Sequence, residues 1–92
     1  MKTLFPLGRL LSTPGALRML EQNGLNGFNF LTRHATGDFG DLCPEDQQAN
    51  QHALVDGTRI FSSYVINARK DKLWIITEAD RSVTTLLLPE EY

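Results

Sequence analysis

The segment from His34 to Asp41 combines the residue types of this chain that are best suited to binding or chemistry. It reads His-Ala-Thr-Gly-Asp-Phe-Gly-Asp and places two carboxylates, Asp38 and Asp41, between two predicted helices. Glycines let the backbone approach a ligand closely, and His34 with two carboxylates could hold a hard cation or a water molecule. The alternative is a structured loop, in which Asp38 and Asp41 accept hydrogen bonds from backbone N–H groups. The sequence favours this structural role, with a ligand or partner surface as the second interpretation.

A second polar cluster lies in the turn over residues 77–82, between two apolar runs. Its charged residues are Glu78, Asp80 and Arg81, and we expect Arg81 to pair with one of the two carboxylates. Neighbouring carboxylates suit acid–base chemistry, but a turn between two strands needs polar residues in any case. A small enzyme or ligand-binding protein would require this turn and the 34–41 segment to converge on one pocket.

The soft metal ligands of the chain are spaced too widely for a structural zinc site. Eight residues separate His34 from Cys43, and another eight separate Cys43 from His52, whereas zinc sites pair their ligands at short spacings. We therefore predict no metal, no cofactor and no catalytic set. Cys43 directly precedes Pro44, so we expect it at a helix N-terminus, where the helix dipole could lower the pKa of its thiol. The sequence favours the alternative, a small buried or capping residue.

Positive charge gathers in one predicted hairpin loop, which contains Arg69, Lys70 and Lys72. These residues are the candidates for contact with nucleic acid, but the formal net charge is -2 and no basic helix is evident, so nucleic acid is an unlikely partner. A nucleic-acid-linked regulator stays open as an alternative. Residues 34–58 hold five acids and no lysine or arginine, and they could meet a basic partner or form a solvated face.

The composition is that of a small globular protein. The chain has 92 residues, of which 41% are hydrophobic and 22% charged, so we expect one domain over residues 1–92. A single cysteine argues against a disulfide framework and suits a reducing compartment. No stretch approaches the roughly 20 apolar residues of a membrane helix. We therefore expect a cytoplasmic protein without membrane contact.

The first half of the chain, about residues 13–57, predicts three short helices, and a short strand over residues 8–12 could precede them. The predicted starts and stops are marked by capping residues, prolines and glycines, namely Ser12 or Thr13 with Pro14, Gly24, Asn26, Gly37, Pro44 and Gly57. Asn50 falls on the apolar side of the third helix. A buried polar side chain must find hydrogen-bond partners, so we expect Asn50 to hold a neighbouring loop.

The second half, about residues 58–89, predicts three strands over 60–66, 73–77 and 83–88, because the hydrophobic period changes to two and β-branched residues become frequent. We expect an α+β fold, with about three short helices packed on one face of a three- to four-stranded antiparallel sheet. On the other face, either Leu73 and Ile75 or Trp74 and Ile76 would point outward. An exposed apolar face has to be covered, which predicts a homodimer or a protein partner on the sheet face.

Three stretches of the chain carry a resemblance. They read TPGAL at 13–17, FLTRHATGDFGDL at 30–42 and LWIITEADRSVTTLLLPEEY at 73–92. In these stretches the chain resembles a family of small uncharacterised bacterial proteins that are often described as plasmid-related. The resemblance implies a bacterial protein associated with a mobile element, and it brings no reaction, ligand or catalytic residue with it. Together with the missing catalytic set, it favours a non-catalytic protein-interaction or accessory module.

Overall fold

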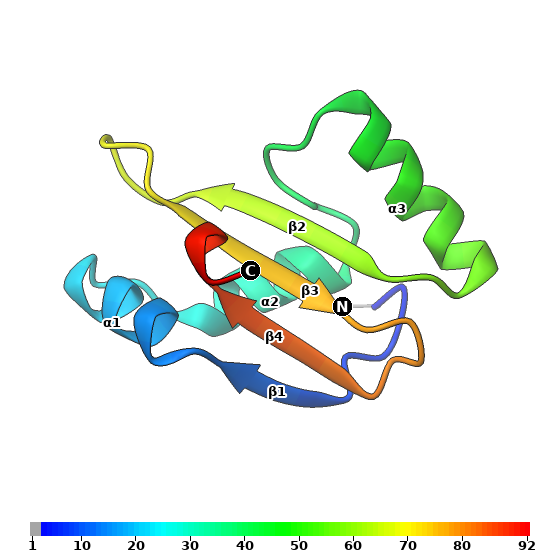
Figure 1. Ribbon diagram of the computed structural model, residues 1–92, viewed down its shortest axis with the longest axis horizontal. Coiled ribbons are helices and arrows are strands. Elements are labelled where there is room, and N and C mark those ends of the chain that lie inside the picture. Colours follow the sequence, from blue (N-terminus) through cyan, green and yellow to red (C-terminus); the bar gives the residue numbers. More distant parts are fainter. Residues whose placement is uncertain (1–2) are drawn as a thin grey trace.

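The computed structural model describes residues 3–92, which form a four-stranded sheet and three α-helices (Figure 1). The elements in chain order are β1 (Arg9–Ser12), α1 (Pro14–Gln22), α2 (Gly27–Ala35), α3 (Pro44–Asp56), β2 (Ile60–Val65), β3 (Lys72–Thr77), β4 (Val83–Leu87) and the 3-10 helix η1 (Pro89–Glu91). The α+β class predicted from the sequence is confirmed. No helix within the described residues is both long enough and apolar enough to cross a bilayer.

The sheet has the strand order β1-β4-β3-β2 and is mixed. Strands β2, β3 and β4 form the expected antiparallel meander. The first strand differs from the expected all-antiparallel arrangement, because β1 pairs with β4 in parallel. Three helices and a hairpin separate β1 from β4 in the chain, and they provide the long crossover connection that parallel pairing requires.

Local capping chemistry explains where the helices begin and end. The Thr13 side chain accepts a hydrogen bond from the Ala16 N–H at the start of α1, and the Asn26 side chain accepts one from the Phe28 N–H at the start of α2. Gly57 ends α3 in the left-handed conformation, with φ at 74°. These three boundaries were predicted from the sequence and are confirmed.

The main hydrophobic core lies between the sheet and the first two helices. It is a cluster of buried side chains from α1, α2 and three strands, namely Ala16, Leu20, Phe30, Leu31, Tyr64, Leu73, Ile75 and Leu86. Helix α3 instead lies along the β2 edge of the sheet (Figure 1). Only Asn50 and Ala53 of α3 are buried, and so short a buried stripe cannot cover a sheet face.

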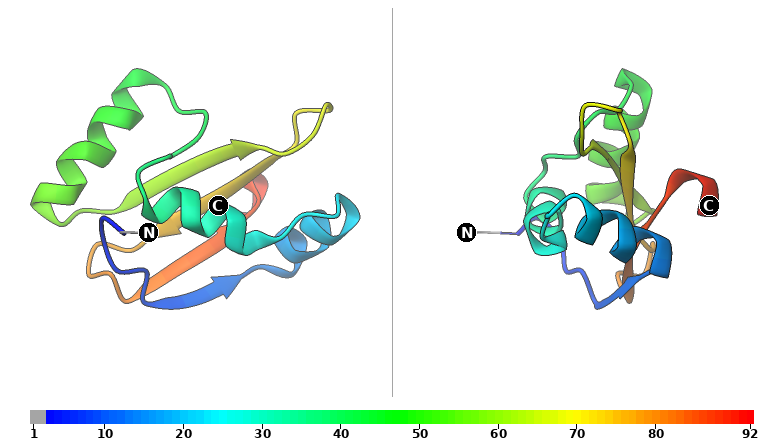
Figure 2. Two further views of the ribbon diagram at one scale, coloured as in Figure 1. Left: turned by 180° about the vertical axis from the view of Figure 1, so that it is seen from behind. Right: turned by 90° about the vertical axis from the view of Figure 1, so that its left-hand side faces the viewer.

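The opposite face of the sheet carries Trp74 and Ile76, since Leu73 and Ile75 face the core. Figure 2 shows η1 on the side of the sheet away from α2. The Trp74 ring centroid lies 5.8 Å from that of Tyr92 and 4.8 Å from that of Phe61. The chain's own C-terminal segment therefore covers part of the face that the sequence analysis assigned to a partner.

Candidate functional site

The two edges of the sheet differ in how their backbone groups are satisfied. At the β2 edge, the Asn50 side chain bonds both outward groups of Phe61. Its Nδ2 donates to the Phe61 carbonyl at 2.6 Å, and its Oδ1 accepts from the Phe61 N–H at 3.0 Å. Asn50 is 2% exposed, so its predicted structural role is confirmed, but the segment that it holds is a strand and not the loop that was expected.

The loop between α2 and α3 bonds Ser63, the next outward residue of β2, while the outward groups of Val65, the last residue of the strand, have no hydrogen-bond partner within residues 3–92. The Ser63 N–H donates to the Phe39 carbonyl at 3.1 Å, and the Asp41 N–H donates to the Ser63 carbonyl at 2.6 Å. Gly40 lies between these two bonds with φ at 77°, and a Cβ on it would stand 2.2 Å from the Ser63 oxygen. The glycine permits this close approach, and the outward groups of Phe61 and Ser63 are all bonded.

The β1 edge is open. The Arg9 N–H donates to Ser82 and the Thr13 N–H donates to Leu86, at 2.9 and 3.0 Å. In a parallel ladder alternate residues bond to the neighbouring strand, so the N–H and C=O groups of Leu10 and Ser12 point away from β4. Within residues 3–92 these four groups have no hydrogen-bond partner.

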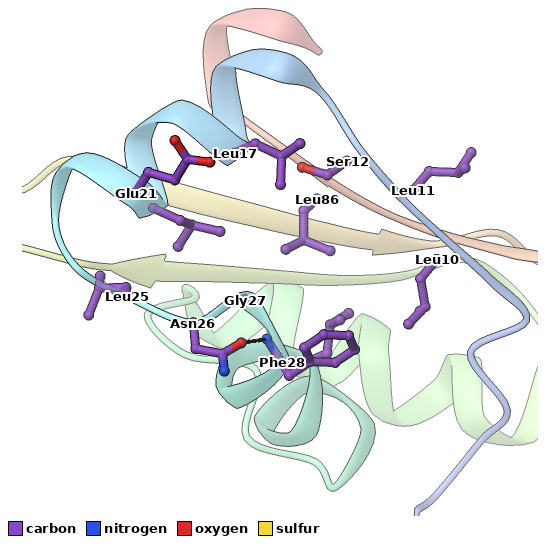
Figure 3. Close-up of a pocket in the computed structure, with 12 residues that line it drawn as sticks. Leu10, Leu11, Ser12, Leu17, Glu21, Leu25, Asn26, Gly27, Phe28 and Leu86 are labelled. Carbon is purple, nitrogen blue, oxygen red and sulfur yellow. Dashed lines mark hydrogen bonds between the residues drawn. The ribbon is translucent and has the colours of Figure 1, made fainter.

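An apolar groove of about 440 Å³ adjoins this open edge, between β1, α1 and α2 (Figure 3). Large, apolar and largely exposed side chains line it, namely Leu10 at 45%, Leu17 at 52% and Phe28 at 65%, and Leu11, also 45% exposed, borders it from the opposite face of β1. The buried residues Leu20, Leu31 and Leu86 also line it. A smaller hollow of about 280 Å³ shares Leu10, Phe28 and Leu31 with the groove and extends it along α2. Exposed apolar surface beside unpaired backbone is typical of an interaction site.

Of the residues singled out in the sequence, His34 is fully buried and belongs to a hydrogen-bonded chain. Its Nδ1 lies 2.5 Å from Ser62 Oγ and its Nε2 lies 2.9 Å from Thr77 Oγ1. Thr77 Oγ1 lies 2.7 Å from Thr84 Oγ1, and the Thr84 hydroxyl donates to the Leu7 carbonyl at 2.7 Å. The network links α2 to β2, β3, β4 and the segment before β1.

The direction of this chain of hydrogen bonds determines the His34 tautomer. The Thr84 proton goes to the Leu7 carbonyl, so Thr84 accepts from Thr77, and Thr77 in turn accepts from His34. The imidazole proton is therefore on Nε2, and Nδ1 accepts from Ser62. Burial lowers the pKa of His34 to about 4, which keeps the ring neutral. His34 joins secondary-structure elements and is not available to a ligand from solvent.

Asp38 and Asp41 have partners that fix their loop against α2 and β2. Asp38 forms an ion pair with Arg33, with 2.7 Å between Oδ2 and Nε, and its Oδ1 accepts from the Gly40 N–H at 3.2 Å. The hydrogen bond from Arg33 lowers the pKa of Asp38. Asp41 takes part through its backbone N–H, as described above. Among residues 3–92 no group of three or more His, Cys, Asp or Glu side chains is close enough together to hold a metal ion.

The 78–82 turn is likewise held by local bonds. Asp80 accepts from both the N–H and the hydroxyl of Ser82, and this contact lowers its pKa. We expected Arg81 to pair with the Glu78 or Asp80 carboxylate, and this prediction was wrong. The Arg81 guanidinium donates instead to backbone carbonyls, including those of Thr58 at 2.6 Å and Ala53 at 2.9 Å. Arg81 thus connects this turn to the end of α3, because the last carbonyls of a helix need donors.

The basic loop and the cysteine complete the set of sequence candidates. Arg69 pairs with Asp71 at 3.3 Å, while Lys70 and Lys72 are exposed. Cys43 occupies the N-cap of α3, as expected, although its side chain makes no capping hydrogen bond, and the alternative of a lowered thiol pKa was wrong. The Asp46 N–H lowers the pKa of Cys43, yet its contacts with the Asp46 and Glu45 carboxylates outweigh this effect, so the pKa is raised overall.

Sequence reasoning missed the groove residues. One signal was present, since Leu10 and Leu11 are adjacent in a short strand and must therefore lie on opposite faces of it. That this strand forms an edge depends on its parallel pairing with β4, which no local pattern indicates. Comparison of the chain with protein-family models, curated proteins and solved structures gave no match.

Proposed function

We propose that this protein is an interaction module that binds an extended polypeptide segment by strand addition to β1. The observation that carries the proposal is the difference between the two sheet edges. Asn50 and the 39–41 loop bond the β2 edge at Phe61 and Ser63, whereas within residues 3–92 all the outward backbone groups of β1 are free and lie beside an apolar groove. Unpaired edge strands are templates for another strand, and folded proteins usually block them.

The site suits a polypeptide better than a small ligand. Its polar groups are the N–H and C=O of Leu10 and Ser12, which are spaced as one side of a strand ladder. In strand addition these groups supply the hydrogen bonds and neighbouring pockets select alternate side chains. Side chains of the added strand on the α2 side would contact Leu17 and Phe28. The preferred segment therefore has apolar residues at alternate positions.

Two parts of the wider prediction remain separate from this proposal. The sequence favoured a partner on the sheet face, but the large exposed apolar side chains that line a groove are at the β1 edge. The association with a mobile element is implied by the family resemblance alone and stays a prediction. The polar turns at 34–41 and 78–82 add no support for an enzyme, because His34, Asp38, Asp80 and Arg81 already have intramolecular partners.

The test uses peptides selected from a random display library on the wild-type protein, followed by titration with NMR detection. We expect the selected peptides to have apolar residues at alternate positions and to protect the Leu10 and Ser12 amides from hydrogen exchange. Ser12→Pro removes one outward N–H and no hydrogen bond to β4, and it should weaken binding at least about tenfold. Val55→Lys, at a residue of α3 that is 87% exposed, is the control and should bind normally.

The proposal fails if no peptide binds at concentrations up to about 1 mM. It also fails if the selected peptides bind Ser12→Pro as well as wild type, or if they shift resonances only on other surfaces. Circular dichroism and thermal unfolding of each variant separate loss of binding from loss of fold. The titration is carried out at low protein concentration, so that self-association does not compete with the peptide.

A further inference from the structure

We infer that the strand added to β1 is the β1 strand of a second copy, in an antiparallel homodimer whose two-fold axis passes through Leu11. This inference rests on the proposed function, since it names the occupant of the same edge. It joins the two four-stranded sheets into one continuous sheet. Three features of β1 support it: the positions of its free backbone groups, its length and the charges at its ends.

The free backbone groups of β1 are complementary to themselves. With Leu11 opposite its own counterpart, Leu10 of each copy faces Ser12 of the other. Both residues point their N–H and C=O groups outward, so each such pair exchanges two hydrogen bonds, as in an antiparallel ladder. All the outward groups of both strands are then satisfied, and the two Leu11 residues form the closely spaced pair without hydrogen bonds between them.

Other registers lose these bonds. A shift by one residue places outward groups opposite groups that already bond β4. A shift by two residues places Ser12 opposite Gly8, where φ is 66° and the strand has not begun, or places Leu10 opposite Pro14, which has no N–H. The register centred on Leu11 is therefore the one in which the edge is fully paired.

The length of β1 also matches a second copy. The strand starts after the bend at Gly8 and ends where α1 begins at Pro14. A longer added strand would extend past the free backbone at both ends, whereas another β1 ends where this one does. Figure 1 shows β1 along one border of the sheet, with no described element beyond it. No helix, strand or loop backbone of the described residues therefore lies in the path of a second sheet edge in this view.

Opposite charges meet in this register. Arg9 of one copy lies across from Thr13 of the other, and the Thr13 hydroxyl donates to Glu91 Oε1 at 2.6 Å. Arg9, Leu11 and Thr13 share one face of the extended segment, so the Arg9 guanidinium faces the Glu91 carboxylate of the second copy. Arg9 is exposed and forms no ion pair within residues 3–92. The Thr13 hydrogen bond lowers the pKa of Glu91 and keeps it ionised. The symmetry gives two such pairs.

The first test is sedimentation equilibrium of the full chain. We expect a concentration-dependent dimer for wild type. Leu11→Lys places two lysines across the two-fold axis and should weaken the dimer at least about tenfold. Val55→Lys makes the same kind of change on α3 and should leave the dimer intact. A wild-type monomer up to about 1 mM would overturn the inference, and so would a dimer that persists unchanged in Leu11→Lys.

A charge exchange tests the register. Arg9→Glu and Glu91→Arg should each weaken self-association several-fold, because each homodimer then contains two like-charged pairs. An equimolar mixture restores both attractive pairs and should form heterodimers about as tightly as wild type. Glu90→Arg is the control for the change at position 91. A mixture that associates no better than the separate variants would overturn the assigned register.

These results are distinguishable from failure of the proposed function. If the protein is monomeric but selected peptides protect Leu10 and Ser12, strand addition stands and the second copy as occupant is wrong. If the protein is monomeric and no peptide binds, strand addition and the homodimer are both wrong. If the protein dimerises and each of the variants Leu11→Lys and Ser12→Pro abolishes the dimer, strand addition and the second copy as occupant are both supported.

Discussion

The side-chain amide of Asn50 pairs with the backbone of Phe61 as a neighbouring strand would, with its nitrogen 2.6 Å from the carbonyl oxygen and its oxygen 3.0 Å from the N–H nitrogen. One side chain from α3 thereby replaces a strand at the β2 edge. The same molecule leaves the β1 edge without such a substitute. This difference between the two edges is the basis of the proposed function.

Replacement of Asn50 by alanine should therefore destabilise the protein and expose the β2 edge. It removes two hydrogen bonds and leaves the outward groups of Phe61 unpaired next to a buried cavity, so we expect a loss of about 2 kcal/mol in the free energy of unfolding. Urea unfolding, monitored by circular dichroism, measures this loss in the free energy of unfolding. Gln51→Ala, at an exposed position on the same helix, should change stability by less than about 0.5 kcal/mol. Equal effects of the two variants would contradict the role assigned to Asn50.

Gly40→Ala should be more damaging than Gly24→Ala, although both glycines have positive φ values, 77° and 64°. At Gly40 an added Cβ would stand 2.2 Å from the Ser63 oxygen, whereas at Gly24 nothing lies within 4 Å of it. Gly24→Ala should therefore cost only the backbone strain, about 1 kcal/mol. Gly40→Ala adds the displacement of the 39–41 loop, and we expect at least about 2 kcal/mol in total. Hydrogen exchange of the Ser63 amide should increase in Gly40→Ala alone.

Stability should fall as the pH decreases from about 6.5 to about 4, in part because of His34. Its pKa is about 4 in the folded protein, against 6.5 as the ordinary value. Between these values the unfolded chain binds a proton that the folded protein does not, so acidification favours unfolding. The difference between the two pKa values corresponds to about 3 kcal/mol in the free energy of unfolding. This stabilisation is present above pH 6.5 and is lost once the pH reaches about 4.

The His34 contribution can be isolated by comparing urea unfolding of wild type and His34→Gln at several pH values. His34→Gln should be less stable at pH 7, and its stability should depend less on pH over this range. His52→Gln changes an exposed histidine and should keep the wild-type pH profile. A profile in His34→Gln parallel to that of wild type would show that His34 titrates normally and contradict its burial in the neutral form.

Arg81→Lys should not substitute for the arginine. The guanidinium donates through separate nitrogens to the carbonyls of Thr58 and Ala53, and an ammonium group has no such fork of donors. We expect both Arg81→Lys and Arg81→Ala to lose about 1 kcal/mol, given that the side chain is partly exposed. Hydrogen exchange at the Gly57 amide, which bonds the Ala53 carbonyl, should increase. If Arg81→Lys behaves as wild type, charge alone accounts for the contact.

Much of the fold could be predicted because its signals are local. The caps at Thr13 and Asn26, the left-handed Gly57 and the two-residue period after residue 58 each act within a few residues of where they occur. The candidate site was predicted less well. The polar residues that attracted attention, such as His34 and Arg81, are engaged in contacts between segments distant in the chain. Their chemical type was evident from the sequence, but their partners were not.

The sequence by itself determined the α+β class, the positions of the elements and the need of Asn50 for hydrogen-bond partners. Only the tertiary structure decided that β1 joins β4 in parallel, that Asn50 bonds Phe61 at one sheet edge and that Leu10 and Ser12 leave the other edge open. The physical reason is that capping and periodicity depend on neighbours in the chain. Strand order and edge exposure depend instead on pairing between distant segments, and that pairing is selected by packing of the whole chain.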